Sequence, residues 1–367
     1  MSKPASIISV AKVHEAKESV LLAVDKAMEL AKWGEYLKSS PELPKKIFIK
    51  VNLLSHQVVP GHCTSPYVLE GVIKKLQEGN FEIFVGDANV ATIKQVETAA
   101  LNWGILDVCN KYGAKFVNLS KQLIKEVDFE GEIFKKMYFP QILTEVDYII
   151  TIPVPKTHNV STMTCALKNQ WGCIPTFRHQ FHSVVHKAIA EINKALKVNF
   201  VVCDATVCSE GEGPRTSLPK ICDYVFASND LVAMDSFIAD FMGINKEEVK
   251  HIFWSEKLGL GSSKYTLIGE ASGLLDENKK VISQNFRKPV QKNHPIVFLE
   301  MKLRKIPVLS YLIFKTFLFK FPAYIASRYN SIYWYNKIGR KSAKEIMNKH
   351  PLYKEEFEDL ISNQKQI

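Results

Sequence analysis

The first 270 residues alternate between short apolar runs and longer amphipathic segments. Runs rich in β-branched residues predict strands, and apolar positions three and four apart predict helices. The predicted strands are Ile7–Val10, Ile47–Leu53, Phe81–Val85, Ala114–Asn118, Tyr148–Ile152, Asn199–Asp204, Tyr224–Ser228 and Tyr265–Gly269. The predicted helices are Ser19–Leu37, Pro66–Glu78, Val96–Tyr112, His182–Leu196 and Leu231–Met242. This alternation favours an α/β fold, with a mostly parallel, doubly wound sheet and helices on both faces.

Two segments depart from the alternation. Lys121–Tyr138 predicts a small antiparallel hairpin, with Gly131 at its turn. After Gly269 the pattern ends, and an aromatic-rich stretch follows. We therefore expect three parts: an α/β domain over residues 1–270, a linker over 271–295, and a basic amphipathic helical appendage over 296–367.

The expected appendage carries the charge of the whole chain. Residues 301–344 contain ten Lys or Arg and no Asp or Glu, which equals the formal net charge of +10. Ten aromatic residues lie among these cations, and Pro307 and Pro322 divide the stretch into short pieces. This composition is typical of a helix that lies on an anionic membrane surface. Packing on the α/β domain and formation of a homo-oligomer are alternatives; no specific nucleic acid is expected, because no nucleic-acid module accompanies the stretch.

Composition and cysteine usage narrow the class of protein. The 46% hydrophobic and 23% charged content is ordinary for a soluble globular protein. Seven cysteines without close paired spacing do not predict a disulfide framework or an iron–sulfur cluster, so buried, inert thiols are the simpler interpretation. The chain lacks a signal-peptide pattern and an uninterrupted membrane span. We expect a cytoplasmic protein, either in solution or peripheral on the inner face of the membrane.

The segment 153–182 holds the densest group of chemically active side chains. It follows the strand Tyr148–Ile152 and contains two lysines and three histidines: Lys156, His158, Lys168, His179 and His182. Loops at the carboxyl ends of strands in an α/β sheet are where such proteins bind their ligands. A cationic, imidazole-rich loop there predicts a site for a small anionic ligand, a divalent metal ion, or both.

Polar side chains also follow the other predicted strands, and in a parallel sheet they would meet this loop at one edge. We assign catalytic roles to Lys156, His158, Lys168 and Asp204. The residues expected to bind substrate are Lys50, Asn52, Asp87, Asn169 and Glu210. The residues expected to hold a metal ion are His158, His179, His182, Asp230 and Asp235.

Several of these residues have simpler interpretations. Asp230 precedes an apolar helix and fits the role of its N-cap equally well. His179 and His182 lie three apart, on one face of a predicted helix, where histidines are more often surface or core residues than ligands. Lys168 could be solvated. Neither standard nucleotide-binding motif, G-x-G-x-x-G or G-x-x-x-x-G-K-[ST], is present.

Five motifs, in this order and spacing, resemble the "domain of unknown function 362" family. They are KVNLL (Lys50–Leu54), TSPYVLEGVIKKL (Thr64–Leu76), VGDA (Val85–Ala88), IPVPKTH…TCALKNQWGCIP (Ile152–Pro175) and ASNDLVAMD (Ala227–Asp235). The resemblance spans about residues 45–270. It implies a shared site at Lys156, His158, Lys168, Asn169, Asp204 and Asp230. Some members carry ferredoxin-like cysteine motifs, but this chain has no C-x-x-C-x-x-C run, so the resemblance does not imply an iron–sulfur cluster here.

The function that follows is an enzyme acting on a small carboxylate or phosphate through a Lys/His/Asp site, with or without a metal ion. The alternative is a membrane-peripheral protein that binds a ligand, or assists a redox reaction, without catalysis of its own.

Overall fold

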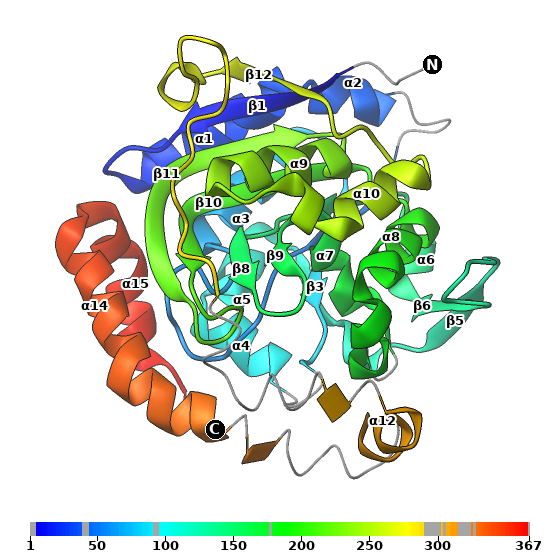
Figure 1. Cartoon of the computed structure of the whole chain (residues 1–367). Helices are drawn as coiled ribbons and strands as arrows, with labels where there is room; N and C mark the ends of the chain where they lie inside the picture. The colour runs from blue at the N-terminus through cyan, green and yellow to red at the C-terminus, as the bar shows by residue number, and fades with distance from the viewer. Residues whose placement is uncertain are drawn as a thin grey trace.

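We analysed a computed structural model of the chain, shown in Figure 1, which describes residues 5–38, 44–90, 95–175, 178–289, 302–303, 306–314, 324–325 and 328–365. The predicted linker and appendage therefore fall partly outside the described residues. Within residues 5–269, wherever the structure describes the chain, strands and helices alternate as the sequence predicts.

The central element is a ten-stranded sheet whose main path runs β12-β1-β11-β10-β7-β2-β3-β4, with β8 and β9 added beside β10. Its strands are β1 (Ser6–Lys12), β2 (Lys46–Lys50), β3 (Glu82–Asp87), β4 (Lys115–Asn118), β7 (Tyr148–Thr151), β8 (Lys156–His158), β9 (Thr162–Thr164), β10 (Phe200–Glu210), β11 (Leu218–Ser228) and β12 (Tyr265–Gly269). Most neighbours are parallel, as the alternation predicts. The exception on the main path is β11, which is antiparallel to both β1 and β10. Its carboxyl end therefore lies at the opposite edge of the sheet from those of β2, β3, β7 and β10.

The predicted hairpin is confirmed. β5 (Ile124–Val127) pairs antiparallel with β6 (Met137–Pro140), and the two form a separate small sheet. The backbone N–H of Gly131 donates to the carbonyl of Phe134 within the connection.

The helices are α1 (Lys17–Leu30), α2 (Trp33–Lys38), α3 (Pro66–Leu76), α4 (Val96–Asn102), α5 (Ile105–Tyr112), α6 (Ile142–Glu145), α7 (Ala166–Asn169), α8 (Val185–Leu196), α9 (Leu231–Met242), α10 (Lys250–Lys257), α12 (Pro307–Phe314), α14 (Arg340–Lys349) and α15 (Pro351–Asn363). Short 3-10 helices are η1 (Leu119–Lys121), η2 (Gln170–Cys173), η3 (Arg178–Val184), η4 (Lys246–Glu248) and η5 (Ser272–Leu274), and η8 (Tyr329–Gly339) is a π-helix.

Two segments that we predicted as single continuous helices are each divided into two helices. The predicted helix Ser19–Leu37 is divided into α1 and α2, because Lys32 adopts a left-handed φ of 59°. The predicted helix Val96–Tyr112 is divided into α4 and α5 by Gly104, at φ 66°. Glycine adopts this conformation at little cost, and lysine does so less readily.

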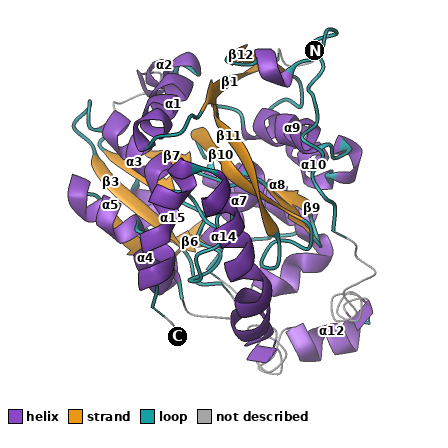
Figure 2. Cartoon of the chain, turned by 90° about the vertical axis from the view of Figure 1, so that its left-hand side faces the viewer, coloured by secondary structure: helices purple, strands orange, loops and turns teal. Residues whose placement is uncertain are grey.

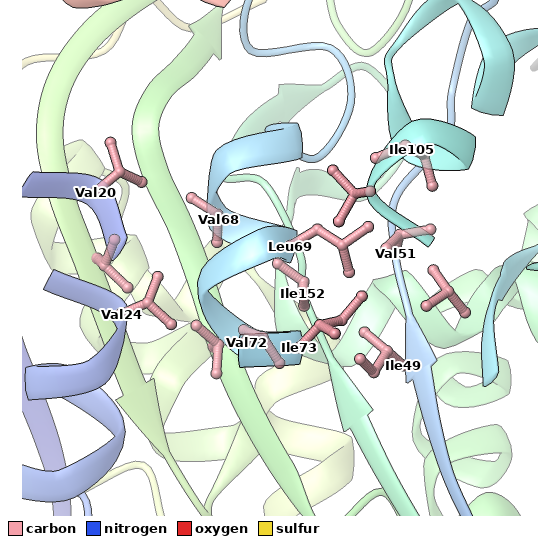
Figure 3. Packing of buried hydrophobic residues seen from close by; sticks show 14 of the residues in the cluster. Val20, Val24, Ile49, Val51, Val68, Leu69, Val72, Ile73, Ile105 and Ile152 are labelled. Atoms are coloured by element: carbon pink, nitrogen blue, oxygen red, sulfur yellow. The ribbon is translucent and has the colours of Figure 1, made fainter. Parts of the chain in front are cut away.

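The sheet buries both of its faces. Along β2, Ile47 and Ile49 belong to one apolar cluster and Phe48 to another, because successive side chains point to opposite faces. The first cluster lies under α1, α3, α4 and α5; Figure 3 shows Val68, Leu69, Val72 and Ile73 of α3 packed against it. Helices α7, α8, α9 and α10 cover the other face (Figure 2).

Helix α15 contributes to the first cluster, although it comes from the predicted appendage. Leu352, Tyr353, Phe357 and Ile361 are buried there, and the Phe357 ring packs edge-on to Trp103 at a centroid distance of 6.0 Å. The alternative of packing on the α/β domain therefore describes this part of the C-terminal region. Over the described residues, no helix combines the length and apolar character needed to cross a membrane.

Replacing Phe357 by alanine is expected to lower the free energy of unfolding by about 3 to 5 kcal/mol, because the ring is 2% exposed and truncation leaves a cavity. Chemical denaturation in urea measures this loss. Phe253→Ala is the matched control, since the Phe253 ring on α10 is 59% exposed. An equal, small effect of both substitutions would contradict the integration of α15 into the core.

Candidate functional site

The edge formed by the carboxyl ends of β2, β3 and β7 holds a buried ion pair. Lys50 and Thr151 end their strands in register, and Asp87 ends β3 beside them. The Lys50 Nζ lies 2.7 Å from Asp87 Oδ1, and both side chains are almost fully buried. The sequence prediction that these two residues meet at one edge is confirmed.

Neighbouring backbone groups form further hydrogen bonds with both members of this ion pair. Asp87 also accepts hydrogen bonds from the backbone N–H groups of Leu53 and Ala88, and Lys50 donates to the carbonyl of Val51. Gly172 approaches so closely that a Cβ there would lie 2.6 Å from Asp87 Oδ1. The pair therefore organises the loops around it, while its binding of substrate stays a prediction.

Lys156 differs from Lys50 in its partners. Its ammonium group donates to Asn52 Oδ1 at 2.5 Å and to the Val154 carbonyl at 3.3 Å. Among the described residues, no carboxylate oxygen lies within 4.0 Å of this nitrogen, and the side chain is only 2% exposed. Burial disfavours the charged form and lowers the pKa of Lys156 to about 8. A lysine with this pKa can exchange a proton near neutral pH.

Two asparagines connect Lys156 to the ion pair. Asn169 donates to the Lys50 carbonyl at 3.2 Å and to Thr151 Oγ1 at 2.9 Å. Asn52 donates to Asn169 Oδ1 at 3.4 Å while it accepts from Lys156. The structure thus brings these residues together: Asn52 holds the Lys156 ammonium group, and Asn169 fixes Asn52 relative to the end of β2.

Asp204 lies in the middle of β10 and is also buried. Its carboxylate accepts from the backbone N–H of Ser65 at 2.8 Å and from Thr206 Oγ1 at 2.6 Å. Burial raises the pKa of Asp204, and the charge of Lys156 opposes that rise. Lys156 and Asp204 therefore interact electrostatically without forming a direct ion pair.

A second carboxyl group lies behind Asp204. Ser65 Oγ donates a hydrogen bond to Glu356 Oε1 of α15. Burial and the charge of Asp204 raise the pKa of Glu356 to about 8, although the bond from Ser65 opposes the rise. The C-terminal helix therefore places a neutral carboxylic acid next to this site at neutral pH.

His158 has a defined tautomer. Its Nδ1 accepts from the backbone N–H groups of Val160 at 3.0 Å and Ser161 at 3.2 Å, so the ring proton of the neutral imidazole belongs on Nε2. Burial and nearby cations hold the pKa of His158 well below its usual value. A metal ion or a transferred proton would need a lone pair on Nε2, which this tautomer does not offer. The geometry favours a hydrogen-bond donor, in place of the acid–base or ligand role that the sequence suggests.

Lys168 extends the cationic character of the site. Its Nζ lies 5.7 Å from the centre of the Trp171 ring, within range of a cation–π contact. Burial, together with the charges of Arg178 and Lys156, lowers the pKa of Lys168 to about 7. Arg178 donates to the carbonyls of Trp171 and Asn89. Three cations thus lie close enough to repel one another, which a bound anion would relieve.

Two predicted residues are engaged by other partners. Glu210 ends β10 and pairs with Arg287, with Nε at 2.6 Å from its carboxylate, so its charge is neutralised there. Asp230 caps α9 by accepting from the backbone N–H groups of Val232 and Ala233. Because β11 runs antiparallel, Asp230 follows that strand at the opposite edge of the sheet from Lys156, and the expected convergence was wrong for it.

Among their described side chains, the residues predicted to hold a metal ion do not form a group of three ligands. Asp235 lies on α9 with its carboxylate 3.4 Å from His251 Nε2, and His182 stacks on Trp171. His179 falls in η3, and its side chain lies outside the described structure. In the described parts of the chain, no three His, Cys, Asp or Glu side chains are grouped to hold a metal ion.

Sequence reasoning missed several residues near the site. They are His62, Ser65, Arg178, Arg215, His186, His251 and Glu356. Arg178 and Arg215 carried a usable signal, since Arg178 lies within the segment 153–182 and Arg215 directly follows the glycine-rich stretch Gly211–Pro214. Arg215 lines a small pocket at this edge together with Leu53, His56 and Gln95. Glu356 carried no signal, because nothing in its local sequence links it to Ser65.

The cysteines behave as the simpler interpretation predicts. Six are buried, and Cys222 is half-buried. Burial raises the pKa of the Cys63 and Cys173 thiols to about 12, which disfavours the reactive thiolate.

These features define an α/β protein with a buried, cation-rich site at the carboxyl edge of a mostly parallel sheet. A family model described as "Domain of unknown function (DUF362)" matches residues 47–240, which is more than half of the chain. The chain belongs to this family, and the resemblance inferred from the motifs is confirmed.

Two further similarities accompany the family match. The thylakoid-associated protein sll1697 of Synechocystis sp. (strain ATCC 27184 / PCC 6803 / Kazusa) is 24% identical over 260 residues, covering 66% of this chain and 76% of the relative. The lactate racemase apoprotein from Thermoanaerobacterium thermosaccharolyticum is 14% identical, with a TM-score of 0.31, covering 62% of this chain and 56% of that one. A structural similarity of this size supports no inference about activity.

Lys50→Met is expected to lower the free energy of unfolding by about 3 to 5 kcal/mol, because it leaves the Asp87 carboxylate buried without its cation. Combining it with Asp87→Asn removes both charges and should recover part of the loss. Urea denaturation of the single and double variants measures the difference. Lys121→Met, which breaks an exposed pair with Glu97, is the control and should cost no more than about 1 kcal/mol. No recovery in the double variant would argue against a direct ion pair.

The Glu356 carboxyl predicts a pH dependence of stability. Its pKa is about 8 in the folded chain and 4.5 ordinarily, so the folded state keeps a proton that the unfolded state releases. The contribution of this proton to the free energy of unfolding is fully present below pH 4.5. It declines as the pH rises towards 8, by at most roughly 1.4 kcal/mol per pH unit. Asp204, whose pKa is also raised, acts in the same direction.

Glu356→Gln should therefore flatten this decline when urea denaturation is repeated across that pH range. Glu358→Gln, at an exposed position on the same helix, is the matched control and should keep the wild-type slope. Identical slopes for the wild type and both variants would show that Glu356 is already ionised in the folded chain.

Proposed function

We propose that this protein is an enzyme acting on a small anionic substrate, a carboxylate or a phosphate, at the carboxyl edge of its sheet. The observation that carries this proposal is Lys156, a buried ammonium group with no carboxylate within ion-pair distance in the described structure. A buried charge is costly unless it is paired. An anionic substrate would supply the missing partner.

The surrounding cations support the choice of an anion. Lys168 and Arg178 lie on the segment that crosses this edge, and Arg215 lines the adjacent pocket. The carboxylates nearby are already engaged: Asp87 with Lys50, and Asp204 with Ser65 and Thr206. Lys168 and Arg178 have no carboxylate partner within 4.0 Å in the described structure, so an anionic group could offset their charges.

The residues divide into three roles. Lys168 and Arg178 attract and hold the anionic group. Lys156, with a pKa of about 8, takes up or releases a proton at the reacting atom. His158 donates a hydrogen bond from Nε2 and stays neutral, and Asp204 stabilises the charged form of Lys156.

A second function, ligand binding at a membrane without catalysis, is favoured by a different observation. The relative from Synechocystis is described as thylakoid-associated, and the C-terminal region of this chain exposes many apolar side chains. Under this proposal the same cationic site would hold a ligand, and the protein would lie on the membrane surface.

The first test measures the lysines directly. NMR titration of the protein labelled with ¹³C-lysine should give two lysine signals with pKa values of about 7 and about 8, assigned by their loss in Lys168→Met and Lys156→Met. Inorganic phosphate and oxalate should raise the thermal midpoint of the wild type, and Lys156→Met should abolish that rise. Lys279→Met, at an exposed position on a distant turn, is the matched control.

The second test separates catalysis from binding. The protein is incubated with a mixture of small carboxylates and phosphate esters, and mass spectrometry follows their consumption. Consumption by the wild type and Lys279→Met, but not by Lys156→Met, would support the enzyme. Anion binding without consumption of any compound would favour the binding protein, and the same consumption by all three would sink the role given to Lys156.

A further inference from the structure

The helix η8 has two faces of different character. On the inner face, Trp334 and Tyr335 are buried and pack with Val59, and the Trp334 ring stacks on His62 at a centroid distance of 5.7 Å. Tyr335 also accepts a hydrogen bond from Gln364. Gly339 completes this face, since a Cβ there would lie 2.9 Å from the Trp334 ring. The inner face therefore fixes η8 on the α/β domain.

The outer face of η8 exposes apolar side chains to solvent. Ile332 is 55% exposed and Tyr333 is 53% exposed, and Tyr329 stacks on Tyr333 beside them. The contrast with Trp334, 6% exposed, and Tyr335, 4% exposed, shows that these side chains point away from the α/β domain. This face has no partner within the described structure.

Exposed apolar residues are concentrated in this part of the chain. Of the eighteen large hydrophobic side chains that are exposed in the described structure, ten lie between positions 306 and 338. They are Ile306, Val308, Tyr311, Leu312, Tyr324, Ile325, Tyr329, Ile332, Tyr333 and Ile338. Scattered exposed hydrophobic residues need no explanation, but such a concentration marks an interaction surface.

The charges beside these residues are all of one sign. Arg328, Lys337, Arg340, Lys341 and Lys344 are exposed. No acidic residue occurs anywhere in 301–344. Cations without neighbouring acids complement a negatively charged partner, and aromatic with aliphatic side chains match the boundary between lipid headgroups and acyl chains.

We propose that the exposed side chains of η8 and the start of α14, together with those described at 306–312 and 324–325, dock on the surface of an anionic lipid bilayer. The helices lie on the bilayer without crossing it, with Ile332 and Tyr333 inserted and Lys337 and Lys341 at the headgroups. Trp334 then connects the docked helix to His62, whose ring is close enough to Lys156 for the lysine charge to lower the pKa of His62. The membrane surface would thus lie next to the wall of the anion site.

Co-sedimentation of the full chain with vesicles tests this inference. The chain should bind vesicles of phosphatidylcholine mixed with phosphatidylglycerol, and it should bind vesicles of phosphatidylcholine alone much more weakly. Added salt should weaken binding to the anionic vesicles. The charge variant Lys337→Glu with Lys341→Glu should lower the partition coefficient roughly tenfold or more. The apolar variant Ile332→Ser with Tyr333→Ser should lower binding to a similar extent.

The controls make equivalent changes elsewhere on the surface. Lys279→Glu with Lys280→Glu alters the charge by the same amount, and Leu22→Ser with Leu123→Ser removes exposed apolar side chains. Both control variants should bind as the wild type does. Lys156→Met should also keep vesicle binding, so this result stands apart from the outcome for the anion site.

Three outcomes would overturn the proposal. The intact chain could fail to sediment with anionic vesicles at low salt, or the control and test variants could lose binding equally. Alternatively, sedimentation velocity could show a dimer that Ile332→Ser with Tyr333→Ser dissociates, with no vesicle binding, which would assign the surface to a second copy of the chain.

Discussion

The buried pair of Lys50 and Asp87 is the interaction on which the site depends. It joins the carboxyl ends of β2 and β3, and its spare hydrogen-bonding capacity is used by the backbone of Leu53 and Ala88. Gly172 leaves the room that the pair occupies. Because a buried ion pair stabilises little overall but is costly to break, its main effect is to fix the geometry of the loops that carry Asn52 and Asn169.

That geometry explains why Lys156 differs from Lys50. Both ammonium groups are buried at the same edge, yet one has a carboxylate at 2.7 Å and the other has only neutral oxygen partners. Asp204 is near enough to influence Lys156, but its oxygens are held by Ser65 and Thr206. Asp204 therefore offsets part of the Lys156 charge from a distance, without the direct contact that Asp87 makes with Lys50.

Much of the fold, and part of the site, could be predicted from local sequence. Lys50 and Asp87 end their strands and Lys156 follows β7, and they lie at one edge because parallel strands bring their carboxyl ends together. The prediction for Asp230 was wrong because it assumed that β11 is parallel too. The sequence pattern gives the positions of strands but not the direction of β11. The tautomer of His158 depends on the turn at Val160 and Ser161, and the contact between Ser65 and Glu356 joins positions 291 apart. Tertiary structure alone decides both.

The C-terminal region, which lies outside the part matched by the family model, completes the site from two sides. Glu356 of α15 contacts Ser65, whose backbone holds Asp204, and Trp334 of η8 covers His62 on the approach to Lys156. The family core supplies the cations, while this region supplies a neutral acid and an aromatic cover. A change at Glu356 reaches Lys156 through Ser65 and Asp204, and a change at Trp334 reaches it through His62. For this chain, residues 47–240 alone would lack the contacts of Glu356 with Ser65 and of Trp334 with His62.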